Sequence, residues 1–210
     1  LDMRMIRPAL LCLFFLSLGA FAEELPFLKP TVSYTGLRVI QSPEGEFRQR
    51  VFWTPDKVRT ETDMPGMAVV NIVREDLGLM WILPQGGGMC LEQTLAESDA
   101  MSLAPGAEAY EPEDMDFREI GTDTIDGRPV TQYEVVSKTD MGDNRALFWV
   151  TEENIPVRME VEPAAGEGTG KVLITLEELE TGPQADELFE SGMECRPMPA
   201  MPHQMPGGGN

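Results

Sequence analysis

Apart from carboxylates, few side chains in this chain of 210 residues could carry out chemistry. The only histidine, His203, lies among prolines, methionines and glycines near the C-terminal end. A catalytic triad or a histidine metal site in the folded core would need a histidine in that core. Because His203 is expected outside the core, both kinds of site are excluded from it. No glycine-rich phosphate loop follows a strand pattern and opens a helix. Carboxylates abound, so counting leaves a paired-acid site open. We expect no enzyme and no cofactor.

The C-terminal residues offer one metal-binding pattern. Three thioethers and an imidazole lie close together there, at Met198, Met201, His203 and Met205. These soft ligands suit monovalent copper. The alternative is a proline-rich tail without a ligand, in a chain that has 14 methionines. We expect residues 196–210 to be disordered and keep copper binding as a minor hypothesis.

Two cysteines, Cys90 and Cys195, remain once the N-terminal segment is set aside. Thiols are oxidised in exported compartments, which favours a disulfide between them. Such a bond requires their Cα atoms to come within about 7 Å. The alternative is two unpaired thiols.

Residues 1–22 have the pattern of a secretory signal peptide. Arg4 and Arg7 precede an apolar run over Ala9–Phe21, and Ala20-Phe21-Ala22 is a small-x-small cleavage pattern. We expect cleavage near Ala22–Glu23 and a periplasmic or secreted product with one domain over residues 23–195.

Other readings of this N-terminal segment are less favoured. The apolar run is shorter than the roughly 20 residues of a membrane-spanning helix, and no later stretch approaches that length, so we expect no integral membrane segment. A lipid anchor at Cys12 would require small residues where Leu11 stands. We expect translation to start at Met3, because Leu1 and Asp2 precede it.

The charge balance restricts the partners. The chain has 36 acidic and 16 basic residues, a formal net charge of −20. An acidic surface repels nucleic acid and anionic lipid headgroups, so we expect no nucleic-acid partner. The acidity either keeps an exported protein soluble or forms a docking face for a cationic envelope protein.

A hydrophobic period of two predicts β-structure over most of the chain. Turn signals between the runs suit antiparallel hairpins. Short helices are expected around Leu95–Leu103 and over Pro183–Glu190. The expected strands include Phe47–Trp53, Lys57–Thr62, Met67–Val73, Leu79–Leu83, Met89–Gln93, Phe117–Ile125, Val130–Ser137, Arg145–Thr151, Pro156–Val161 and Lys171–Leu179.

About eleven strands of this kind predict a mainly β fold, a single curved antiparallel sheet or open barrel. The alternation of Val157, Met159 and Val161 with charged residues is typical of a strand with one wet face. Val69–Val73, Leu79–Leu83 and Ala146–Val150 are apolar on both faces. Their second face is covered either by the protein's own loop and helix or by a ligand or partner. The long acidic stretch Leu95–Asp116 could be such a cover, and whether it acts as a lid stays open.

Short segments along residues 31–195 resemble the DUF4412 family. In the first half they are Lys57–Glu61, Val70–Arg74, Met80–Pro84 and Leu91–Glu92, and in the second half Ile125–Tyr133, Leu147–Val150, Ile155–Met159 and Leu188–Glu190. That family is similar to the periplasmic lipoprotein carriers LolA and LolB. The resemblance implies an open half-barrel with helices against its concave face, and it brings no active site. Cys90 stands where many members have an aromatic residue.

The resemblance favours a non-enzymatic envelope protein that holds an apolar guest, such as lipid or lipoprotein acyl chains, on the concave face. Burial of an acyl chain is favourable by about 0.8 kcal/mol per methylene. The alternative is an interaction or envelope-stress sensor domain with a self-filled core. The candidate lining residues are Trp53, Met80, Trp81, Ile82, Trp149 and Met159.

Overall fold

The computed structural model describes residues 29–64, 67–84, 88–95, 115–139, 142–162 and 170–198. The expected signal peptide, the expected helix after Leu95 and the Met/His residues beyond Met198 lie outside these ranges. No helix within them is long and apolar enough to cross a membrane.

Within the described ranges, twelve strands form one sheet in the order β12-β6-β5-β4-β3-β2-β1-β11-β10-β9-β8-β7. The strands are β1 (Tyr34–Ser42), β2 (Gly45–Thr54), β3 (Lys57–Met64), β4 (Met67–Arg74), β5 (Leu79–Pro84), β6 (Cys90–Thr94), β7 (Met115–Ile125), β8 (Arg128–Thr139), β9 (Gly142–Val150), β10 (Pro156–Glu162), β11 (Val172–Thr181) and β12 (Cys195–Pro197).

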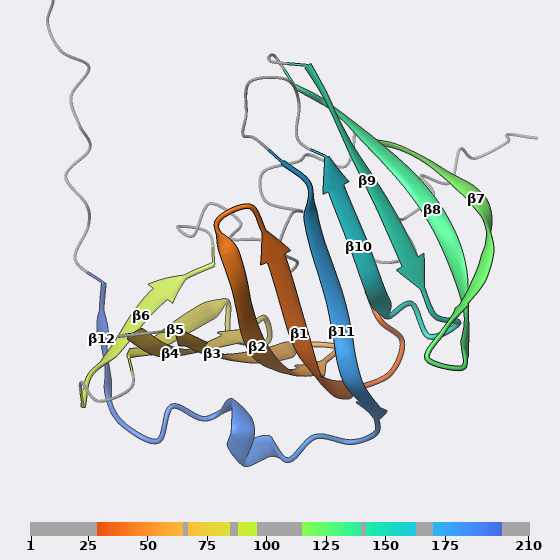
Figure 1. Cartoon of the computed structure of the whole chain (residues 1–210). Helices are drawn as coiled ribbons and strands as arrows, with labels where there is room; N and C mark the ends of the chain where they lie inside the picture. The colour runs from red at the N-terminus through yellow and green to blue at the C-terminus, as the bar shows by residue number, and fades with distance from the viewer. Residues whose placement is uncertain are drawn as a thin grey trace, which may run out of the picture.

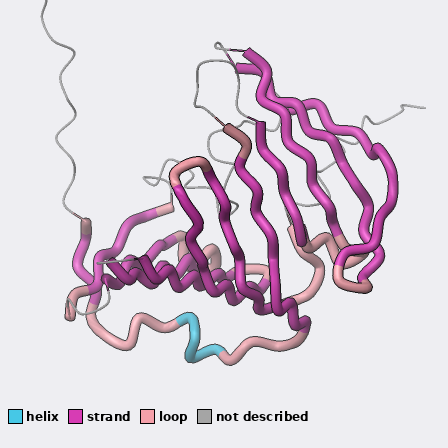
Figure 2. The backbone as a smooth tube through the Cα atoms, viewed as in Figure 1, coloured by secondary structure: helices cyan, strands magenta, loops and turns pink. Residues whose placement is uncertain are grey.

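Two antiparallel meanders make up this sheet. In the first meander, β1–β6 succeed one another from the middle of the sheet towards one edge. In the second, β7–β11 succeed one another from the opposite edge back to the middle, where β11 pairs with β1. The sheet bends strongly near β2 and β3, so that β3–β6 lie across the lower end of the other strands (Figures 1 and 2). We call the side inside this bend the inner face and the opposite side the outer face. The expected fold, an open half-barrel of one curved antiparallel sheet, is confirmed.

The period-two runs predicted the strands well. Each expected run coincides with an observed strand to within a few residues. β12 was not expected; it pairs with β6 in parallel, whereas the other pairings of the described sheet are antiparallel. β12 extends to Pro197, so the described part of the domain continues slightly beyond residue 195.

Residues 182–194, which we call the C-terminal strap, connect β11 to β12. The strap contains η2, a 3₁₀ helix over Asp186–Phe189, shorter than the helix expected over Pro183–Glu190. It contacts β3 and β4 and runs below them on the outer face (Figure 1). Phe189, 1% exposed, packs there in one cluster with Val70, Ile72 and Trp81. The strap therefore explains why β4 and β5 are apolar on both faces.

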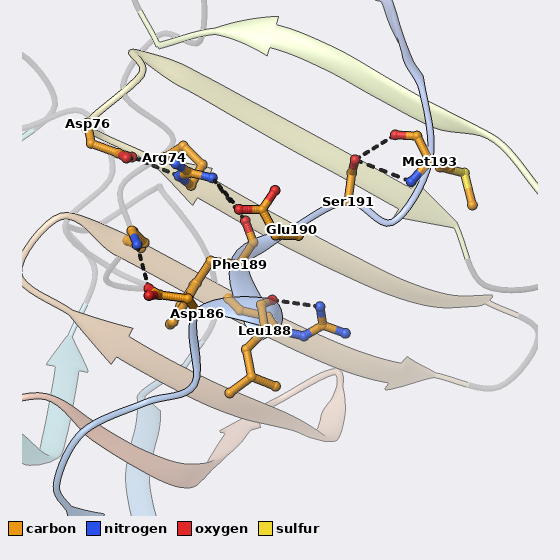
Figure 3. A network of polar contacts seen from close by, with 10 residues as sticks. Arg74, Asp76, Asp186, Leu188, Phe189, Glu190, Ser191 and Met193 are labelled. Carbon is orange, nitrogen blue, oxygen red and sulfur yellow. Dashed lines mark hydrogen bonds and ion pairs between the residues drawn. The ribbon is translucent and has the colours of Figure 1, made fainter.

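Basic side chains from the sheet hold the strap in place. Arg59 donates through Nη1 to the Leu188 carbonyl at 2.9 Å, and Arg74 donates to the Phe189 carbonyl at 3.3 Å (Figure 3). Lys57 pairs with Asp186 at 2.8 Å. Arg74 also makes a bidentate pair with Asp76, which raises the pKa of Arg74 and lowers that of Asp76. Strap backbone carbonyls thus find partners on the outer face.

Candidate functional site

An uninterrupted apolar row crosses β1–β5. Residues directly opposite each other in neighbouring strands share a face. The register aligns five such side chains across this arm of the sheet, namely Tyr34, Trp53, Val58, Val73 and Met80. Tyr34 and Trp53 stack with ring centroids 5.8 Å apart. Because η2 and Phe189 cover the opposite side of β3 and β4, this row lies on the inner face.

The row belongs to a larger apolar cluster, which we call the lower cluster. It gains Val157, Leu176 and Leu179 from β10 and β11, and Ile82 packs against it. Its inner-face members are nearly all buried; Val51, for example, is 0% exposed. The cluster therefore joins the two meanders across the bend.

A second apolar cluster, which we call the upper cluster, lies further along the same strands. The register places Ile40, Ile174, Met159 and Phe148 side by side from β1 to β9. Phe47, opposite Ile40, packs against this cluster. Side chains alternate between the two faces along a strand, and Ile40 and Tyr34 are separated by an even number of positions on an uninterrupted β1–β2 ladder. Both clusters therefore lie on the inner face.

A polar row separates the two clusters. Arg38, Gln49 and Thr62 are opposite one another on β1, β2 and β3. Arg38 donates through Nη1 to Gln49 Oε1 at 2.8 Å, and Gln49 donates through Nε2 to Thr62 Oγ1 at 3.0 Å. Thr62 is buried, and Arg38 and Gln49 are partly buried. The inner face is therefore amphipathic, with a cation between two apolar surfaces.

Burial lowers the pKa of the Arg38 guanidinium and raises that of the Tyr34 phenol, and each group opposes the shift of the other. Even so, a guanidinium stays protonated in proteins. No carboxylate of the described ranges forms an ion pair with Arg38, although many other described cations are paired. Arg38 thus keeps an uncompensated positive charge among the described residues.

Gly36, between Tyr34 and Arg38 on the same face, allows β11 to pack closely. A Cβ at this position would lie 2.7 Å from Leu176 Cδ1, closer than carbon atoms approach. Leu176 is 7% exposed and sits opposite Arg38 in the ladder. The missing side chain therefore makes room for Leu176 beside the polar row.

The structure divides the candidate lining residues between the two faces. Trp53, Met80, Ile82 and Met159 lie on the inner face. Trp81 lies on the outer face, opposite Ile72, and donates to Glu92 Oε2 at 3.0 Å. Trp149 is opposite Arg158, whose guanidinium lies 4.8 Å from its ring, so it shares the face opposite Met159. Trp149 is nevertheless only 7% exposed and packs in the lower cluster, so it remains a candidate lining residue. Trp81 packs instead in the cluster beneath the strap, because adjacent strand residues such as Met80 and Trp81 point to opposite faces.

Sequence reasoning missed Arg38, Gln49 and Thr62. A charge in the apolar run Tyr34–Ile40 was the available signal. Because Leu37 and Val39 are also apolar, the alternation did not reveal which face Arg38 occupies.

A polar hollow of about 120 Å³ lies on the outer side of β8–β11. It is lined by Glu134, Arg145, Leu147, Glu160, Glu162 and Lys171. The hollow is well below the roughly 300 Å³ of small ligand pockets, and its opposite charges pair with one another. We assign it a structural role.

The described residues contain no group of three or more His, Cys, Asp or Glu side chains arranged to hold a metal ion. Of the copper candidates, Met198 lies within the described ranges; its backbone N–H donates to the Glu92 carbonyl at 2.8 Å. Met201, His203 and Met205 lie outside them.

No protein-family model and no curated protein matches the chain. The resemblance to DUF4412 therefore stays a prediction. Solved structures do match. An uncharacterized conserved protein from Thermus thermophilus aligns with a TM-score of 0.54 and 11% identity, over 80% of this chain and 90% of that one.

MucB aligns equally well, with a TM-score of 0.54 and 17% identity over 80% of this chain. MucB in the MucA/MucB complex of Pseudomonas aeruginosa aligns with a TM-score of 0.50 and 18% identity over 80% of this chain. The match spans 60% of the MucB chain. At such identities the likeness concerns the fold.

Proposed function

We propose that this protein is a non-enzymatic envelope binding protein that holds an apolar guest, lipid or lipoprotein acyl chains, on the inner face of its half-barrel. The observation that carries the proposal is the pair of apolar clusters on that face. They are formed by an open sheet rather than by two packed layers. The proposed location is the periplasm or the extracellular space, reached through the signal peptide.

Energetics support acyl chains as the guest. Burying each methylene contributes about 0.8 kcal/mol, so a chain placed along one cluster is held without any catalytic group. Methionines such as Met80 and Met159 lie in the two clusters, and their flexible side chains adapt to guests of different shape.

The three tryptophans allow the face to be tested directly. Fatty acids brominated on the acyl chain quench an indole only on contact. We expect quenching in the wild type. Trp81→Phe should keep this quenching, because the Trp81 indole lies beneath the strap and away from the guest. Trp53→Phe should show a marked loss of quenching, because Trp53 lies on the inner face. Equal quenching of both variants would place the guest elsewhere.

A second measurement identifies the natural guest. Native mass spectrometry of the mature protein from its own envelope, with an organic extract of the same sample, should give a bound mass in the lipid or acylated-peptide range. A clean apo mass with no uptake of added acyl ligands would contradict the proposal.

A protein partner is the second candidate function. MucB, whose fold matches, has been solved in complex with MucA, and the present chain has an acidic exterior that suits a cationic partner. An interaction or envelope-stress sensor domain would retain a filled, dry inner face. Cross-linking in the envelope followed by mass spectrometry tests this candidate, and capture of one partner without copurifying lipid would favour it.

Copper binding by Met198, Met201, His203 and Met205 stays a minor proposal. Truncation after Pro197 should abolish uptake of monovalent copper if these residues bind it. Unchanged copper binding by the truncated protein would remove the hypothesis.

A further inference from the structure

The Arg38 guanidinium is a charged group in an apolar setting. It lies between the lower cluster, which includes Tyr34, and the upper cluster, which includes Ile40, all on the same face of β1. Its described polar neighbours, the Gln49 amide and the Tyr34 phenol, are both neutral groups. Moving a charge out of water is costly unless an opposite charge compensates it.

Several basic side chains on the outer face differ from Arg38, because they are paired with carboxylates. In a chain with 36 acidic residues, Arg50, Lys57, Arg59 and Arg74 all pair with carboxylates. Arg38 forms no such pair within the described ranges. A guanidinium presents five N–H donors, and Gln49 accepts from only one of the two Nη atoms. Donors therefore remain for an oxyanion.

We propose that Arg38 is the anchor for the oxyanion of an amphiphilic guest, a carboxylate or phosphate carried on an acyl chain. This inference rests on the proposed function and narrows its guest to anionic amphiphiles. The acidic exterior repels free anions, so the specificity arises from the combination of a partly buried cation with apolar surface on both sides. The acyl chain extends from Arg38 along one of the clusters.

The polar row also orients the anchor. Gln49 accepts from Arg38 while its own amide nitrogen is held by Thr62. These two hydrogen bonds fix which way the Gln49 amide points, and they hold Nη1 of Arg38 against its oxygen. A fork held in one orientation suits bidentate recognition of carboxylate or phosphate.

The test compares lipids that differ only in the head. Oleate, oleoyl lysophosphatidate and neutral monooleoylglycerol are titrated below their aggregation concentrations by displacement of a fluorescent acyl probe. The wild type should prefer at least one oxyanion lipid over the neutral one by about tenfold or more, the range of a hydrogen bond to a charged group. Comparison of the two anionic lipids distinguishes carboxylate from phosphate.

Two variants assign that preference to Arg38. Arg38→Met should reduce the preference for the oxyanion lipid to about onefold, that is, to equal affinity for the charged and the neutral lipid. The affinity for monooleoylglycerol should stay unchanged, because only the charge–charge part of the interaction is lost. Gln49→Glu keeps the shape of the side chain and puts a carboxylate where an oxygen already lies 2.8 Å from Arg38. It should abolish the preference with the guanidinium still present, and it serves if Arg38→Met does not fold.

Arg50→Met is the matched control. Arg50 lies on the adjacent strand and pairs with Glu178, so its loss changes the net charge equally without touching the inner face. It should retain the full preference.

Three outcomes would overturn the inference. Equal affinity of the wild type for all three lipids would mean that the protein binds acyl chains without reading the head. A preference that survives Arg38→Met would assign it to another cation. Failure of all three lipids to bind would overturn the proposed function as well.

Discussion

Cys90 and Cys195, 105 positions apart in the sequence, are directly opposite each other in the parallel pair of β6 and β12 and are joined by a disulfide. Their Cα atoms are 4.4 Å apart, well within the reach of the bond. Cys90 is 1% exposed and packs in the cluster that contains Phe189. The disulfide therefore fastens the end of the strap to the edge of the sheet that it covers.

Removing this disulfide should lower the free energy of unfolding by about 2–5 kcal/mol, because it closes a long loop and restricts the unfolded chain. Urea unfolding of the mature protein with and without a reductant measures the effect. The double variant Cys90→Ser/Cys195→Ser should match the reduced wild type and show no response to the reductant. A wild-type midpoint unaffected by reduction would contradict the prediction.

Phe189→Ala should destabilise the protein by about 3 kcal/mol, the lower end for truncating a buried phenylalanine. The ring contacts the cluster of Ile72 and Trp81, so its loss also exposes the indole. Denaturation gives the energy, and a red shift of emission in a variant that keeps only Trp81 reports the exposure. Met193→Ala is the control, because this strap side chain is 45% exposed and should change little. Equal effects at both positions would mean that the strap is not anchored by Phe189.

Gly36→Ala should cost about 1–3 kcal/mol, because the new methyl group collides with Leu176. Leu176→Ala removes the colliding atoms, so the two changes should not add: the double variant should be more stable than the sum of the single effects predicts. Gly121→Ala, where a Cβ meets no atom within 4 Å, is the control and should be nearly neutral. Additive behaviour of the pair would exclude the proposed contact.

The stability of the sheet should depend on pH through Glu160. Burial raises the pKa of this carboxyl, but hydrogen bonds from Lys171 and Arg158 outweigh burial and lower it. A depressed folded-state pKa stabilises the protein above the unfolded carboxyl pKa of about 4.3, and this stabilisation is lost as the pH falls through the folded value. Glu160→Gln should therefore lose less stability than the wild type between neutral and acid pH.

Unfolding curves at several pH values measure this difference, with the exposed Glu152→Gln as the control for a change of net charge. A parallel acid limb for wild type and Glu160→Gln would mean that the ion pairs with Lys171 and Arg158 do not couple to folding.

Local patterns predicted most of the strands. The alternation of Val157 and Met159 with charged neighbours identified both β10 and its buried face, since both side chains are 4% exposed. Where both faces are apolar, as in β4 and β5, the same rule failed: Met80 and Trp81 were both expected to line the ligand face. Only the strap that covers Trp81 distinguishes the two.

The sequence by itself determined the antiparallel strands, a single histidine near the C-terminal end, the excess of acidic residues and the two cysteines able to pair. These depend on residue type and on short-range periodicity, which one chain segment contains in full. Tertiary structure alone decided that β11 pairs with β1, that β12 pairs with β6, and that Arg38 lies between two apolar clusters. Such pairings depend on register between distant segments, and a register sets the face of every side chain in a strand.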